Sequence, residues 1–168
     1  LELDGPVISL GQYEYLLENN PIQPSLKVTV FKTLFDRNDT QEQFSDRLKK
    51  ITEDCIKAVQ EGTTIIVLSD RKATKDMLPI PSLLILREVT LGLNRSGLRL
   101  RTSVVVDSGE IKNSHHISCL LGYGASAVCP YLLLERAYFD SVPALQNIFP
   151  RVREKRVIEA LNSGVLRI

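Results

Sequence analysis

The sequence is poor in the residues that most often carry chemistry. It has no tryptophan, two histidines and three cysteines in 168 residues. Cys55, Cys119 and Cys129 form no C-x-x-C pair, and their odd number argues against a disulfide framework. We therefore predict a protein of a reducing compartment rather than a small scaffold held together by disulfides.

The sequence also lacks a charge imbalance and long apolar runs. Its 21 Lys and Arg residues are interleaved with 20 Asp and Glu residues, so no broad basic surface for nucleic acid is expected. No apolar run approaches the roughly 20 residues of a membrane-spanning helix, so no membrane partner is expected either. The chain begins at Leu1 without methionine and ends on Arg167-Ile168, and we expect a piece of a longer polypeptide.

Segments of strand length alternate with helical patterns over residues 27–168. Residues 1–26 are interrupted by glycine and proline and predict a lead-in segment that packs on this domain. The predicted strands are 27–34, 64–68, 101–106 and 127–129, and the predicted helices include 40–62, 82–96, 131–139 and 151–162. Such alternation predicts an α/β fold of parallel βα units. Since a closed barrel needs eight units, we predict an incomplete, TIM-barrel-like domain or an open sheet.

Several residues predict where the helices begin and end. Thr40, with Gln43 three residues later, has the spacing of a capping box, and Gly62 is suited to the position after the helix. The remaining boundary predictions are Ser82 and Ser114 as N-caps, Gly164 as the end of the last helix, and residues 165–168 as the start of another strand.

Polar side chains follow the predicted strands at their carboxyl ends, where α/β proteins usually bind ligands. Ser69-Asp70-Arg71 follows one strand, and Asp107 and Glu110 follow the next, with His115-His116 shortly after. Asp107 and Glu110 could act as an acid/base pair, and Asp70-Arg71 could bind an anion beside them. A structural role is the favoured interpretation, because buried Asp–Arg pairs also tie loops together. A free-standing small-molecule enzyme using Asp107, Glu110 and His115 is the alternative.

Two other motifs are weak signals. Gly122 to Ala127 matches G-x-G-x-x-A, but a helix precedes it and a strand follows, the reverse of a dinucleotide site. A helix C-cap and tight turn explain it better. His115 and His116 point about 100° apart on a helix and cannot easily share a metal ion. We expect one of them to hydrogen-bond Glu110 or Asp107, and Cys119 to belong to the core.

The run D-S-G-E-x-K-x-x-H-H-x-x-C-L-L-G-Y-G-A-S-A-V-C-P-Y-L, residues 107–132, closely resembles the central domain of glutamate synthases. The segments IIVLSDR (65–71), IPSLL (80–84) and SGLRLRT (96–102) are similar to the same family in the same order. The resemblance covers most of the chain. One departure lies at residues 88–93, EVTLGL, where members often carry a histidine cluster.

The resemblance implies a non-catalytic domain that links a glutaminase domain to an FMN-binding synthase domain and helps wall the ammonia tunnel. It implies no cofactor in this chain, with FMN and an iron–sulfur cluster elsewhere in the enzyme. Ferredoxin or NAD(P)H would donate electrons, and the enzyme would reside in a bacterial cytoplasm or a plastid stroma. The candidate interface or tunnel-adjacent residues are Ser69, Asp70, Arg71, Asp107, Glu110, His115, His116 and Tyr123.

Overall fold

The computed structural model describes residues 5–18, 26–139 and 147–168 of the chain. Its elements in chain order are α1 (Leu10–Leu17), β1 (Val28–Lys32), β2 (Leu34–Asp36), α2 (Gln41–Gln60), β3 (Ile65–Ser69), β4 (Met77–Pro79), α3 (Ser82–Arg95), the 3-10 helix η1 (Arg99–Arg101), β5 (Ser103–Asp107), α4 (Ser114–Gly122), β6 (Ala127–Cys129), α5 (Tyr131–Phe139) and α6 (Pro150–Val165). Among the described residues, no helix is long and apolar enough to cross a membrane.

Four parallel strands form the central sheet, in the order β1-β3-β5-β6. β3 and β5 are almost fully buried, as expected for apolar strands that are covered on both faces. In the described ranges the sheet is open, with edges at β1 and β6. The prediction of an α/β domain with parallel βα units and an incomplete barrel is therefore confirmed.

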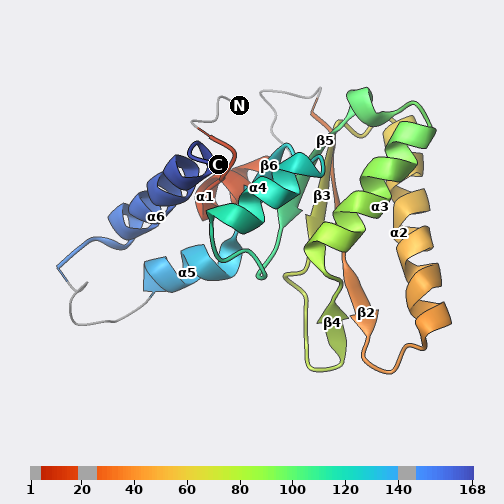
Figure 1. The fold of residues 1–168 in the computed structure, drawn as a ribbon, viewed down its shortest axis with the longest axis horizontal. Helices are drawn as coiled ribbons and strands as arrows, with labels where there is room; N and C mark the ends of the chain where they lie inside the picture. Colours follow the sequence, from red (N-terminus) through yellow and green to blue (C-terminus); the bar gives the residue numbers. More distant parts are fainter. Residues whose placement is uncertain (1–4, 19–25, 140–146) are drawn as a thin grey trace.

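Helices cover the two faces of the sheet (Figure 1). Each face has its own hydrophobic core. The larger core joins one face to α2, α3 and α4, and includes the fully buried Ile66, Val104 and Val128. The smaller core joins the other face to α1 and α5, and includes Val67 and Val105. Alternation along β3 and β5 therefore sends successive buried side chains to the two cores in turn.

Helix α2 begins and ends as the sequence predicts. The Thr40 hydroxyl accepts from the Gln43 backbone N–H at 3.3 Å, and the Gln43 side chain accepts from the Thr40 N–H at 2.8 Å. This reciprocal pair is the predicted capping box. Gly62 follows the helix with φ +94°, a conformation that glycine adopts without steric cost.

A second, two-stranded antiparallel sheet pairs β2 with β4 and was not predicted. The predicted strand 27–34 divides at Thr33, whose N–H donates to the Ser69 carbonyl while its own carbonyl accepts from Ile80. Strands of three residues carry too short a pattern to be read from periodicity.

Four predicted boundaries are wrong. Ser82 and Ser114 are the first residues of α3 and α4 rather than their caps; Pro81 and Asn113 hold the cap positions. Gly164 lies inside α6 and does not end it, and residues 165–168 finish this helix and a turn instead of starting a strand. A Cβ atom at Gly164 would clash with Ser114, so this glycine allows α6 to pack closely on α4.

The lead-in segment is held by α6 and by the edge of the sheet. Val7 forms a parallel bridge with Val128 of β6, and its N–H donates to Asn162 Oδ1 at 3.3 Å. The Leu10 N–H at the start of α1 donates to Glu154 Oε1 at 2.8 Å. These contacts fix α1 against the smaller core. Residues 1–4 and 19–25 of the segment lie outside the described residues.

Candidate functional site

The register of the sheet brings polar residues together at its carboxyl end. Ser69 of β3 is level with Asp107 of β5, and Asp107 is level with Cys129 of β6. Residues that are level on neighbouring strands project to the same face. Ser69, Asp107 and Cys129 therefore all face the smaller core, as continuations of the rows that contain Val67, Val105 and Ala127.

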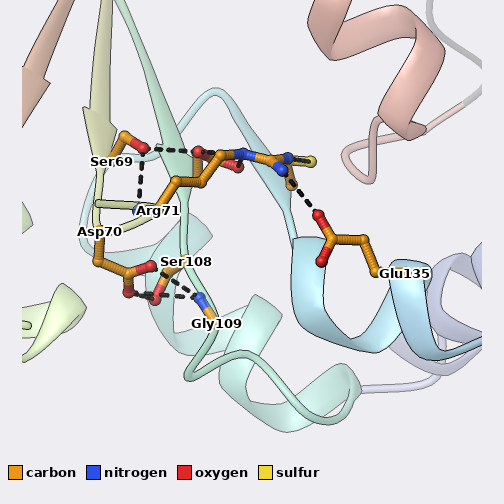
Figure 2. Close-up of polar contacts among 8 residues, drawn as sticks. Ser69, Asp70, Arg71, Ser108, Gly109 and Glu135 are labelled. Carbon is orange, nitrogen blue, oxygen red and sulfur yellow. Dashed lines mark hydrogen bonds and ion pairs between the residues drawn. The ribbon is translucent and has the colours of Figure 1, made fainter. Parts of the chain in front are cut away.

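Asp107 is completely buried and is held by a hydroxyl and a guanidinium. The Ser69 Oγ donates to its Oδ2 at 2.7 Å, and the Arg71 Nε lies 2.9 and 3.1 Å from its two carboxylate oxygens. Arg71 then continues across the sheet end, donating from Nη1 to Glu135 Oε1 at 3.0 Å (Figure 2). Of the residues expected at this end of the sheet, Arg71 and Asp107 lie together, whereas Glu110 pairs with Ser82 instead.

Two tyrosine rings enclose the Arg71 guanidinium. Its Cζ lies 4.5 Å from the ring centroid of Tyr13 and 4.4 Å from that of Tyr131. Tyr13 comes from α1 and Tyr131 from the start of α5, and both are more than nine-tenths buried. Cation–π contacts of this kind are stronger when water is excluded. We call Tyr13, Ser69, Arg71, Asp107 and Tyr131 the Arg71 cluster.

Asp70 organises the adjacent loop that follows β5. Its carboxylate accepts from the Ser108 Oγ at 2.6 Å and from the Gly109 N–H at 3.0 Å (Figure 2). A Cβ atom at Gly109 would lie 2.5 Å from Leu132 Cδ1 and 3.1 Å from the Tyr131 hydroxyl, so the loop approaches α5 more closely than a larger residue allows. Asp70 is thus a structural tie between β3 and the loop that follows β5.

The electrostatics of the cluster follow from its burial. Burial raises the pKa of Asp107, while the hydrogen bond from Ser69 and the charge of Arg71 oppose this. Burial lowers the pKa of Arg71, but the Asp107 carboxylate more than compensates, so the guanidinium pKa is raised overall. Burial and the nearby Asp107 carboxylate raise the pKa of Tyr13, and burial and Asp70 raise that of Tyr131. Both phenols therefore stay neutral beside the ion pair.

The groups around Arg71 are poorly suited to nucleophilic or metal chemistry. Cys129 lies 3.5 Å from Arg71 Nη2, but burial raises the pKa of its thiol well above the ordinary value, which disfavours the thiolate. Across residues 5–18, 26–139 and 147–168, no three His, Cys, Asp or Glu side chains are placed to hold a metal ion. The contacts of the Arg71 cluster can instead fix the positions of β3, β5, α1 and α5 relative to one another.

A second set of predicted residues lines a separate cavity of about 510 Å³ between the starts of α3 and α4. Glu110 Oε2 accepts from the Ser82 N–H at 2.7 Å and so caps α3. His116 Nδ1 lies 3.2 Å from the Glu110 carbonyl, so the expected contact with Glu110 is made to its backbone. His115 lines the same cavity, as does Cys119, which is only half-buried. We call this feature the α3–α4 cavity.

Tyr123 does not join either group. It follows α4 and precedes β6, so it lies at the amino end of the parallel sheet, with 49% of its surface exposed. The turn that contains it has Gly124 at φ +108°, in agreement with the predicted C-cap and tight turn. At residues 88–93 the sequence lacks the histidine cluster that members of the resembled family often carry. In this segment Val89 and Leu93 are fully buried in the larger core.

Sequence reasoning missed Tyr13, Tyr131, Cys129 and Glu135. Tyr131 follows the carboxyl end of β6 and could have been found by extending the strand-end rule to that strand. Tyr13 and Glu135 lie on helices with no pattern that relates them to β3. Their contacts with Arg71 depend on how α1 and α5 pack.

The fold is similar to that of TIM-barrel-like flavin enzymes. A flavocytochrome b2 variant superposes with a TM-score of 0.55 at 22% identity, over 94% of this chain and 33% of that chain. A mandelate oxidase superposes with a TM-score of 0.52 at 22% identity, over 81% of this chain and 32% of that chain. The chain therefore corresponds to about a third of such a protein.

The sequence is similar to several curated glutamate synthases. The ferredoxin-dependent enzyme of Spinacia oleracea, described as chloroplastic, is 38% identical over 181 residues, covering 99% of this chain and 11% of that protein. The ferredoxin-dependent enzyme of Pyropia yezoensis is 34% identical, covering 100% of this chain and 11% of that protein. The NADPH enzyme large chain of Bacillus subtilis is 36% identical, covering 79% of this chain and 8% of that protein. The chain thus spans about a tenth of the length of these relatives.

The family described as "Glutamate synthase central domain" matches residues 1–168, which is the whole chain. Together with the sequence relatives, this match shows that the chain belongs to the glutamate synthase central domain family.

Proposed function

We propose that this chain is the non-catalytic connecting domain of a glutamate synthase. In this role it links the glutaminase domain to the FMN-binding synthase domain of the same polypeptide and helps wall the ammonia route between them. The whole enzyme would convert glutamine, 2-oxoglutarate and reducing equivalents into two molecules of glutamate.

The observation that carries this proposal is the filled carboxyl end of the sheet. Enzymes built on βα barrels place their active sites at this end. Here the space beyond β3, β5 and β6 is occupied by Arg71 between its two tyrosine rings, with Asp107 beneath it. An FMN ring does not fit a position that the chain's own side chains fill. This supports a structural domain whose enzyme carries FMN and the iron–sulfur cluster elsewhere.

Exposed apolar side chains support contacts with neighbouring domains. Phe139, Phe149, Leu166 and Ile168, at the ends of α5 and around α6, each expose about three-quarters or more of their surface. Phe149 and Leu166 cap the two ends of α6, so these side chains leave separate apolar surfaces that neighbouring domains would cover. Because ammonia must stay neutral and must not leak, a rigid, closely packed wall suits this role better than a reactive site.

The electron donor, ferredoxin or NAD(P)H, would act on another part of the enzyme. Two of the relatives above are named for ferredoxin and one for NADPH, so both donors are compatible with this type of domain. The same names lead us to propose a plastid stroma or a bacterial cytoplasm as the compartment.

The proposal is tested by replacing Glu110 or His116 with alanine in the complete polypeptide. Glu110 caps α3 and its carbonyl contacts His116, so both changes loosen the loop between β5 and α4. We expect glutamine hydrolysis to continue while glutamate formation falls, because ammonia escapes. The measurement compares the rates of glutamine loss and glutamate gain.

Lys49→Ala, at an exposed position of α2, is the control and should preserve coupling. Unchanged coupling in both Glu110→Ala and His116→Ala would contradict the connecting role. The alternative of a free-standing enzyme has a separate test. Stoichiometric FMN in the purified chain, or turnover that Asp107→Asn abolishes, would favour it.

A further inference from the structure

Cys119 and His115 form a side-chain pair that the proposed function does not use. The Cys119 Sγ and the His115 Nε2 lie 3.7 Å apart, one turn from each other on α4. Both side chains line the α3–α4 cavity. The i, i+4 spacing on one helix is also that of the two histidines that bind zinc in the H-E-x-x-H motif.

The separation of the two atoms is suited to chelation. Zinc–sulfur bonds of about 2.3 Å and zinc–nitrogen bonds of about 2.0–2.1 Å, at a tetrahedral angle, leave the ligand atoms about 3.6 Å apart. The observed 3.7 Å therefore requires almost no movement of either side chain. His115 and His116 lack this geometry because adjacent helical residues diverge by about 100°.

The surroundings leave room for the rest of a coordination sphere. The cavity has a volume of about 510 Å³, ample for the ion and the water molecules that it retains. Glu110 lines the same cavity, but its carboxylate already accepts from Ser82. In the part of the chain that the structure describes, no third His, Cys, Asp or Glu completes a cluster. Water would therefore supply the remaining positions.

We propose that His115 and Cys119 form a two-ligand site for a borderline divalent cation such as Zn²⁺. Binding is a ligand exchange without oxidation or reduction. The hydrated ion gives up two waters, neutral His115 donates a nitrogen lone pair, and the Cys119 thiol releases its proton to solvent and binds as thiolate. Thiolate and imidazole favour such an ion over Mg²⁺ or Ca²⁺, which prefer oxygen ligands. The proposal does not rest on the connecting role.

The test is alkylation of Cys119 by iodoacetamide in the complete polypeptide, followed by peptide mass spectrometry after EDTA treatment or with added Zn²⁺. At zinc ten times above the dissociation constant, the rate should fall about tenfold, since about one thiol in eleven remains unligated. Mg²⁺ at the same concentration should give no protection. Cys55 and Cys129 are buried, so their labelling would reveal unfolding.

His115→Ala and His115→Asn should abolish the protection, whereas the matched control His116→Ala should retain it. Equal protection in the His115 and His116 variants would overturn the proposal. So would a labelling rate that zinc leaves unchanged, or a Cys119 thiol that stays unreactive after EDTA, because such a site would be closed to solvent.

Discussion

The Arg71 cluster and the α3–α4 cavity lie in neighbouring loops at the same end of the sheet, yet the first is closed and the second is open. Asp107 has no exposed surface, whereas His115 and His116 are both exposed. The two regions use similar residue types, since each has a carboxylate and a cation or imidazole, with a cysteine beside them. They differ in what covers them.

Two helices from distant parts of the chain cover the first region. α1 and α5 bring Tyr13 and Tyr131 over Arg71, whereas the start of α3, the first two turns of α4 and the loop before α4 border the cavity. A charge that is buried and paired becomes structural, because removing one partner leaves the other unpaired in a dry environment. A polar group that keeps contact with solvent can change its partners at little cost.

The largest effect in this comparison is expected from Arg71→Ala. The change leaves the Asp107 carboxylate buried without its cation, and we expect the free energy of unfolding to fall by about 3–5 kcal/mol. Urea unfolding of the isolated chain measures this. The matched control is Arg87→Ala, whose pair with Glu88 is on the surface and should contribute less than about 1 kcal/mol. Similar losses in both variants would mean that the Arg71 cluster is no more structural than a surface pair.

The next effect should appear at alkaline pH. The pKa values of Tyr13 and Tyr131 are raised in the folded chain, so the protonated phenols contribute to the free energy of unfolding. This contribution is fully present below the ordinary tyrosine pKa of about 10. It is lost as the pH rises from there through the folded-state values, because only the unfolded chain releases the protons. At pH 11 the loss is about 1.4 kcal/mol for each phenol that stays protonated.

Urea unfolding between pH 9 and pH 11 tests this loss, with Tyr13→Phe and Tyr131→Phe as the comparison. In each variant the free energy of unfolding should fall less steeply with pH than in the unmodified chain. Cys55 also has a pKa raised by burial and contributes to the decline in all three proteins. An identical slope in all of them would show that the phenols ionise as readily in the cluster as in the unfolded chain.

A smaller loss of stability is expected from changing Glu110, which lines the α3–α4 cavity and also caps α3. Glu110→Ala removes the carboxylate that accepts from the Ser82 N–H, and loss of such a cap costs about 1 kcal/mol. Glu110→Gln retains an acceptor oxygen and should recover most of the loss. Thermal unfolding can rank the three proteins. A Glu110→Gln variant as unstable as Glu110→Ala would argue against capping as the cause.

The smallest effects belong to the cavity wall itself. His115→Ala and Cys119→Ser should each change the free energy of unfolding by less than about 0.5 kcal/mol, since both side chains reach the cavity surface. Urea unfolding in the presence of EDTA keeps any bound metal out of the measurement. A loss above about 1 kcal/mol for either variant would place it with the Arg71 cluster and remove the contrast between the two regions.

The sequence predicts the parts of this fold that depend on local patterns. The apolar strands before Ser69 and Asp107, and the capping box at Thr40, all follow from spacing. Because neighbouring parallel strands have their carboxyl ends at the same end of the sheet, the approach of Arg71 to Asp107 could also be expected. The contact of Tyr13 with Arg71 could not be predicted from the sequence. Tyr13 lies 58 positions earlier in the chain, and only the packing of α1 brings its ring to Arg71.

The errors at helix boundaries have a similar cause. Ser82 has the residue type of a cap, but the side chain of Glu110, from a distant loop, caps α3 by accepting from the Ser82 N–H. Asn113 and Ser114 are both suitable caps, and only the structure shows that the Asn113 side chain accepts from the His116 N–H. Gly164 has the residue type of a helix end, but it is required for close packing against Ser114. Residue type alone does not separate a conformational glycine from a packing glycine.

Helix α6 fastens the lead-in segment at two points, through Asn162 to Val7 and through Glu154 to Leu10. A mechanical pull that separates residues 5–10 from residues 150–165 would therefore strain these side-chain hydrogen bonds before it strained the ladder between β3 and β5. Tension would also reach Arg71 through Tyr13, since α1 carries both Leu10 and that ring. The domain should thus yield first where α1 meets α6, with the four-stranded sheet still intact.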